Sequence, residues 1–97
     1  MASDKEYLDF VLEQLSELDG ISSRSMMGEY IIYYKGKVIG GIYDNRFLVK
    51  NTKSAAKITP ETPLELPYEG AKKMLLADID NKDLMNSLIP AVYDDLC

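Results

Sequence analysis

Apolar side chains recur at helical spacing near the start of the chain. They predict an amphipathic helix over residues 4–19, because residues three and four apart share one face of a helix. Ser3 and Glu6 have the spacing of a capping box at its beginning, and Gly20 suits the left-handed conformation that often ends a helix. The apolar stripe consists of Tyr7, Phe10, Val11, Leu15 and Leu18.

From residue 21 to residue 50 the hydrophobic period changes to two, and β-branched and tyrosine-rich runs alternate with short turns. This pattern predicts antiparallel strands joined by hairpins. The expected strands cover residues 22–27, 29–35, 38–43 and 46–50.

The segment that follows the strands mixes a short helical pattern with prolines. Residues 51–58 predict a short helix or turn. Pro60, Pro63 and Pro67 exclude a central strand over residues 59–67, because proline has no N–H to donate to a neighbouring strand.

The last part of the chain predicts one more strand and one more helix. Residues 74–77 are apolar and form the expected strand. Asp80 is the expected cap of the final helix, in which Pro90 should cause a kink or a split. The apolar stripe of this helix holds Leu84, Leu88, Val92 and Leu96.

These elements predict a single α+β domain over residues 1–97, with an antiparallel sheet of four to five strands flanked by an N-terminal and a C-terminal helix. A length of 97 residues fits one domain. A content of 46% hydrophobic and 28% charged residues is typical of a folded chain rather than a disordered one.

Two-residue turns at Gly36-Lys37 and Asp44-Asn45 would sort the strand side chains onto two faces. A one-residue slip in the pairing of the strands would exchange the faces. The face expected to pack against the helices holds Ile31, Tyr33, Val38, Ile42, Phe47 and Val49. The opposite face holds Tyr30, Ile32, Tyr34, Ile39, Tyr43 and Leu48, with the cations Arg46 and Lys50.

The opposite face therefore carries the candidate interaction surface, which consists of Tyr30, Tyr34, Tyr43, Arg46 and Lys50. Three interpretations of this face remain open. Another segment of the same chain can cover it, or a partner protein or a second copy can bind there, since Tyr and Arg are enriched at interfaces. The third is a platform on which the bases of a single-stranded nucleic acid stack.

Charge is distributed unevenly along the sequence. The net charge is −5 for the whole chain, with −5 over residues 1–19, +4 over residues 20–73 and −4 over residues 74–97. Nucleic-acid binding depends on neutralising phosphates, so the acidic balance argues against nucleic acid as the direct ligand. The basic middle segment still permits contact with an anionic partner.

The residue types exclude most familiar active sites. The chain has no histidine, which is the side chain best suited to proton transfer near neutral pH and a common metal ligand. Its glycines form no phosphate-binding loop, and Asp78, Asp80 and Asp83 lack the rest of a calcium-binding loop. The sequence therefore predicts no catalytic, cofactor-binding or metal-binding residues.

The sequence also predicts a cytoplasmic location without membrane contact. The polar first residues do not resemble a secretory signal, and the longest apolar run, residues 30–34, is too short to span a bilayer. Cys97 is the single cysteine and cannot close an intramolecular disulfide, which is typical of a reducing compartment.

Four segments together resemble the N-terminal domain of the TfoX/Sxy competence-regulator family. They are residues 24–30 (RSMMGEY), 33–39 (YYKGKVI), 44–50 (DNRFLVK) and 67–72 (PYEGAK). In the first segment Met27 and Glu29 replace the aromatic residue and the second glycine of the family motif. The family-motif residues are Arg24, Met26, Gly28, Tyr30, Gly36, Lys50, Tyr68 and Gly70.

Each of these motif positions also has a structural interpretation. Arg24 can pair with Glu29 across a tight turn at Gly28, and both Gly28 and Gly70 suit positive φ. The segment around Tyr68, with Lys72 and Lys73, is either a recognition loop or a solvated turn.

The resemblance implies a bacterial regulatory module without catalysis, which in some members activates DNA-uptake genes. Those members carry a second, C-terminal domain that is not found in these 97 residues. We therefore expect a noncatalytic regulatory or protein-interaction module with an unidentified protein partner, a homodimer being one form of that contact. The alternatives are a single-stranded nucleic-acid-binding module and a small enzyme with a pocket joining Arg24, Glu29, Tyr30 and Lys50.

Overall fold

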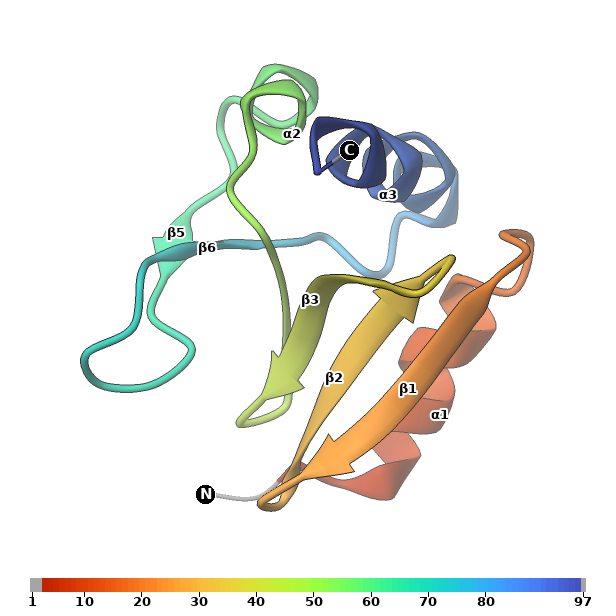
Figure 1. Ribbon diagram of the computed structural model, residues 1–97, viewed down its shortest axis with the longest axis vertical. Coiled ribbons are helices and arrows are strands. Elements are labelled where there is room, and N and C mark those ends of the chain that lie inside the picture. The colour runs from red at the N-terminus through yellow and green to blue at the C-terminus, as the bar shows by residue number, and fades with distance from the viewer. Residues whose placement is uncertain (1–2, 97) are drawn as a thin grey trace.

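The computed structural model describes residues 3–96, so the predicted role of Cys97 lies outside the described residues (Figure 1). The first elements are α1 (Lys5–Gln14), β1 (Ile21–Met26), β2 (Glu29–Tyr34), β3 (Lys37–Tyr43) and β4 (Arg46–Val49). They are followed by α2 (Lys53–Ile58), β5 (Leu64–Glu65), β6 (Met74–Leu76) and α3 (Lys82–Asp95).

The strands form one antiparallel sheet in the order β1-β2-β3-β4-β6-β5. The predicted α+β fold is confirmed, although the sheet has six strands rather than four to five. The additional strand, β5, is a two-residue edge strand between Pro63 and Pro67, so the prolines do keep this segment out of the centre of the sheet.

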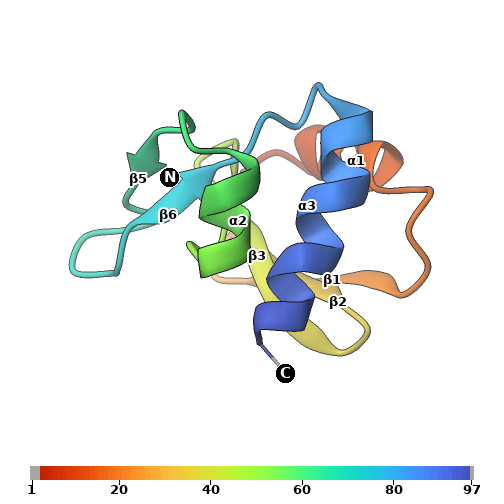
Figure 2. The same cartoon turned by 90° about the horizontal axis from the view of Figure 1, so that it is seen from above.

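The hydrophobic core lies between the sheet and the helices. Val11 of α1, Ile32 of β2, Phe47 of β4 and Leu88 of α3 all belong to it and are fully buried. Burial of each such side chain contributes about 1.5–3 kcal/mol. Figure 2 shows α2 and α3 side by side above the sheet, and the contacts between them confirm this arrangement.

Both long helices differ from their predicted boundaries. Helix α1 ends at Gln14, and turns rather than helix continue toward Gly20, which has the expected positive φ of 95°. The Ser3–Glu6 capping box does not form, because Asp4 is the N-cap and Ser3 instead donates its hydroxyl hydrogen to Glu29. A hydrogen bond to a distant strand thus replaces the local cap.

Helix α3 begins one residue later than predicted and is not split. Its cap is Asn81 rather than Asp80, and the Asn81 side chain accepts a hydrogen bond of 3.0 Å from the N–H of Leu84. Pro90 lies inside the continuous helix, although an interior proline costs about 3 kcal/mol. Burial of the neighbouring Ile89 and Val92 in the core offsets this cost.

The first predicted hairpin turn is wrong by one residue. The turn residues are Lys35 and Gly36, with φ of 51° and 83°, rather than Gly36 and Lys37. A two-residue turn with positive φ at both positions favours glycine at the second position, which places Gly36 after Lys35. A bulge at Ile39 of β3, opposite Ile32 and Tyr33, then shifts the register by one residue, and Ile32 lies opposite Gly40.

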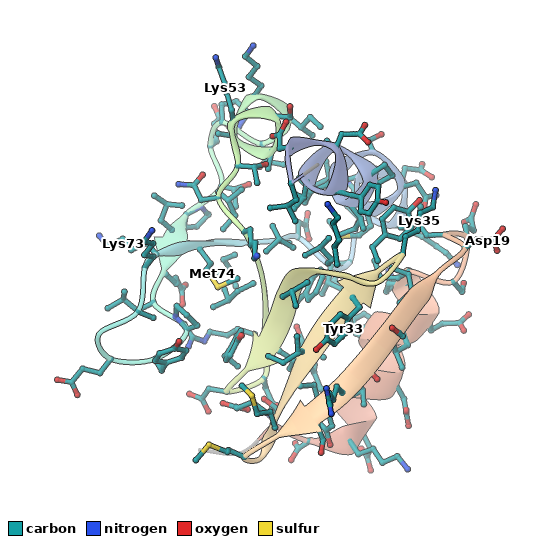
Figure 3. All side chains as sticks on the ribbon, viewed as in Figure 1. Asp19, Tyr33, Lys35, Lys53, Lys73 and Met74 are labelled. Atoms are coloured by element: carbon teal, nitrogen blue, oxygen red, sulfur yellow. The ribbon has the colours of Figure 1, made fainter. Side chains whose placement is uncertain are left out.

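This shift exchanges the two faces of β2. Tyr30, Ile32 and Tyr34 lie on the side of the helices, whereas Ile31 and Tyr33 lie on the other side, contrary to the prediction. In Figure 3 the ring of Tyr33 stands in front of the strands, and α1 lies behind them. We call the side away from the helices the open face.

The second hairpin has the predicted register. Asp44 and Asn45 form the turn, with φ of 52° and 56°, and Phe47 lies opposite Ile42. The core therefore contains Ile42, Phe47 and Val49 as expected.

Candidate functional site

The loop between β5 and β6, residues 66–73, folds back toward the β3–β4 hairpin. The ring centroids of Tyr43 and Tyr68 are 6.2 Å apart, and the rings are tilted by 55°. Tyr43 itself lies over Gly41, where an added side-chain carbon would come within 2.9 Å of the Tyr43 hydroxyl oxygen. The absence of a side chain at Gly41 therefore leaves the space that Tyr43 occupies.

Arg46 ties the start of this loop to the hairpin. Its guanidinium group forms an ion pair with Glu65 and donates a hydrogen bond of 3.1 Å to the carbonyl oxygen of Leu66. Its Nε donates to the carbonyl oxygen of Tyr43 at 3.2 Å. Arg46 thus positions both the loop and the strand that carries Tyr43.

The loop and the hairpin enclose a hollow of about 760 Å³. Lys50 contributes from the end of β4, and Lys72 and Lys73 contribute from the loop. Figure 3 shows Lys73 next to Met74 at the beginning of β6. The lining residues include three lysines and no aspartate or glutamate, so this hollow is positively charged.

A second hollow of about 410 Å³ is also lined by the two tyrosines. Met26 and Met27 line it together with Tyr43, Pro67 and Tyr68. Because Tyr43, Pro67 and Tyr68 line both hollows, we treat the two as one depression and call it the loop groove.

Glu29 lines the methionine end of the loop groove, but its carboxylate is already bonded. It accepts from the hydroxyl of Ser3 and, at 3.0 Å, from the N–H of Asp44. The predicted pairing of Arg24 with Glu29 is not found, since the ion pairs within residues 3–96 join Arg46 to Glu65 and Lys82 to Glu17. In the sheet Arg24 lies opposite Ile31 rather than Glu29.

Burial raises the pKa of Tyr43 above its ordinary value of 10.0, and the neighbouring Tyr68 and Glu29 raise it further. The Tyr43 phenol is therefore protonated at neutral pH. In this form it offers a hydrogen-bond donor and an apolar ring to a ligand.

The predicted interaction surface does not exist as one surface. Tyr34 is only 7% exposed and meets the ring of Tyr93 edge to face at 5.3 Å, and Tyr30 packs against the core. Both therefore lie beneath the helices, because the register shift turned β2 over. Tyr43 and Lys50 do line the loop groove.

The family-motif residues lie in different surroundings. Arg24 is exposed on β1, and Met26 lies at the end of that strand beside the loop groove. Gly28, Gly36 and Gly70 have φ of 86°, 83° and 86°, so the expected positive φ at Gly28 and Gly70 is confirmed.

Sequence reasoning did not bring Lys72, Lys73 and Met27 together with Tyr43. The signal that could have done so was the PYEGAK segment, whose tyrosine and lysine flank a turn glycine. The side chains that face this segment could be predicted only from the pairing of β2 with β3, and the predicted pairing was wrong.

Comparison with known proteins identifies the family of this chain. Residues 13–91 match the TfoX N-terminal domain. The chain belongs to this family. Each of the four segments that carry the resemblance contributes at least one residue to the lining of the loop groove, although up to about forty residues separate the segments in the sequence.

One relative of this TfoX-like chain is a protein of Spirochaeta aurantia that is described as an uncharacterized 12.7 kDa protein in the trpE 5′ region. The two are 36% identical over 78 residues, which cover 80% of this chain and 68% of the relative. No solved structure matches the chain.

Two further site types are not found in the described part of the chain. Residues 3–96 contain no group of three metal-ligating side chains that could hold an ion. None of the helices in this part is both long enough and apolar enough to cross a membrane.

Proposed function

We propose that this chain is a noncatalytic regulatory module that acts by binding a partner protein at the loop groove, in transcriptional or competence control. The observation that carries the proposal is that all four segments resembling the TfoX N-terminal domain contribute residues to the lining of this groove. A regulatory module needs a specific contact surface, and the groove provides the shape for one.

The side chains at the groove are of the types found at protein interfaces. Met27 is 98% exposed, Met26 is 50% exposed and Tyr68 is 63% exposed. Tyrosine and methionine are enriched at interfaces, and methionine adapts its shape to different partners. Burying these side chains against a partner would release the water that now covers them, which favours association.

Cross-linking inside cells tests the proposed contact. A photoreactive benzoylphenylalanine replaces Tyr68 in one variant and Phe10, which is 39% exposed on α1, in a control variant. We expect a discrete cross-linked protein with the variant at position 68 and none with the variant at position 10. Equal cross-linking at both positions, or none at either, would contradict the proposal.

The regulatory role requires a second readout. A chromosomal Tyr68→Glu substitution should change the transcript levels of a defined set of genes in the same direction as deletion of the whole coding sequence. Deletion without any change in transcripts would contradict a regulatory role even if a partner cross-links.

Single-stranded nucleic acid is the second candidate. Lys50, Lys72 and Lys73 beside two tyrosines favour it, because cations and aromatic rings bind phosphates and bases. This candidate predicts binding of an oligonucleotide that weakens steeply with added salt.

A further inference from the structure

The two ends of the loop groove differ in chemistry. Lys50, Lys72 and Lys73 line one end. Met26 and Met27 line the other end together with Glu29, whose carboxylate is already hydrogen-bonded within the protein. Tyr43 and Tyr68 lie between the ends and belong to both. A ligand that fills the whole groove therefore needs negative charge at one end and an apolar group at the other.

The lysines at one end of the loop groove form no ion pair within residues 3–96. Residues 1–19 and 74–97, which include α1 and α3, carry most of the acidic side chains. The only ion pairs within residues 3–96 involve Arg46 and Lys82, so the three groove lysines keep their charge for a ligand. An excess of cations in an otherwise acidic protein selects an anionic partner.

We propose that the occupant of the loop groove is an acidic peptide segment of the partner protein, with aspartate or glutamate side chains at the lysine end and an apolar side chain at the methionine end. This inference rests on the proposed function, since it names the chemistry of the partner at the same groove.

An extended peptide of about eight residues is long enough to cross a groove on a molecule of this size. An extended chain advances about 3.3 Å per residue, so about eight residues would reach across most of a molecule whose longest dimension is 30 Å. A segment of this length can place an apolar side chain between Met26 and Met27 and carboxylates near Lys50 and Lys72. Methionine side chains can accommodate several apolar residues at that position.

The tyrosines favour a peptide over stacked bases. One side of the Tyr43 ring is occupied by the backbone at Gly41, and Tyr68 lies near the ring as well. Tyr43 is half-buried, whereas Tyr68 is exposed. The groove therefore offers one accessible ring rather than the row of free rings on which successive bases stack.

Selection from a random peptide library tests the inference. The purified chain is immobilised and used to select binders from displayed random peptides of about eight residues. This length is set by the reach of an extended chain. We expect the selected peptides to be enriched in Asp and Glu near an apolar residue. One selected peptide is then synthesised with a fluorescent label, together with a version in which Asn and Gln replace Asp and Glu, and an oligothymidylate serves as the nucleic-acid probe.

Matched charge variants locate the binding site. Lys72→Glu with Lys73→Glu reverses two charges at the groove, and Lys5→Glu with Lys57→Glu reverses two exposed charges on α1 and α2. We expect the groove variant to weaken binding of the acidic peptide about tenfold or more, because each lost exposed pair accounts for up to about fivefold. The control variant should change binding less than about threefold, through long-range charge alone.

The outcomes separate this inference from the proposed function. Selection of uncharged or basic peptides, or no selection at all, overturns the acidic occupant, while a cross-link at position 68 would still support a protein partner. Equal weakening of peptide binding in the groove variant and the control variant would overturn the claim that the peptide binds at the loop groove. Binding of oligothymidylate at the groove without binding of any peptide overturns both proposals.

Discussion

Replacing Arg46 with alanine is expected to loosen residues 64–73 without unfolding the sheet. Arg46 is the side chain that joins the β4 strand to both Glu65 and the carbonyl oxygen of Leu66. The substitution leaves Glu65 without its cation and removes the donor to Leu66. The segment that carries one wall of the loop groove should therefore open more often.

The size of this effect follows from the exposure of the two partners. The side chains of Arg46 and Glu65 are 28% and 35% exposed, so water screens their ion pair, which contributes about 0.5–1 kcal/mol. The hydrogen bond to Leu66 adds about 0.5–1.5 kcal/mol. A combined loss of about 1–2.5 kcal/mol multiplies the open population of the loop about 5–70-fold.

Hydrogen exchange measures this opening directly. The N–H of Ala71 is bonded to Tyr68 and the N–H of Leu76 is bonded to Pro63, so both should exchange faster in the variant. Amides of the β2 strand should keep their exchange rates. Unchanged exchange at Ala71 and Leu76, or equal acceleration in β2, would refute the role assigned to Arg46.

Three further predictions concern stability and pH. Gly41→Ala should lower the free energy of unfolding by about 1–3 kcal/mol in a urea titration, because a side-chain carbon there would lie 2.7 Å from the carbonyl oxygen of Tyr30. An unchanged midpoint of unfolding would contradict this close contact. Leu88→Ala should cost about 2–5 kcal/mol in the same assay, since Leu88 is fully buried, and a loss below about 1 kcal/mol would argue against its core position. The N–H and hydroxyl of Ser54 hold the pKa of Asp95 below 3.8, so this contact stabilises the fold above that pH and its contribution is lost as the pH falls through the lowered pKa. Ser54→Ala removes the hydroxyl but keeps the N–H, so it should raise the pKa of Asp95 only part of the way toward its ordinary value in an NMR titration. An unshifted titration would show that the hydroxyl bond does not form in solution.

The second hairpin could be predicted from sequence because its turn chemistry is unambiguous. Asp44 and Asn45 both tolerate positive φ, and the strands on either side then align Ile42 with Phe47. The first hairpin lacked this clarity, since Gly36 could occupy either turn position. A two-residue turn with positive φ at both positions favours glycine at the second position, and this preference places the turn at Lys35 and Gly36.

The bulge could not be predicted from hydrophobic alternation. Ile39 and Ile42 are both fully buried in the core, yet residues three apart point to opposite faces of a regular strand. The bulge opposite Ile32 and Tyr33 resolves this conflict by adding one residue to β3. The predicted interaction surface was wrong for the same reason, because Tyr30 and Tyr34 lie on β2, whose two faces are exchanged relative to the prediction.

An NMR titration of the labelled chain with the selected acidic peptide tests the central claim most directly. We expect the largest amide shift changes in residues 26–29 and 66–73, which line the two walls of the loop groove. Changes centred on α1 or α3, with the amides of the groove unaffected, would contradict the claim that this groove is where a partner binds.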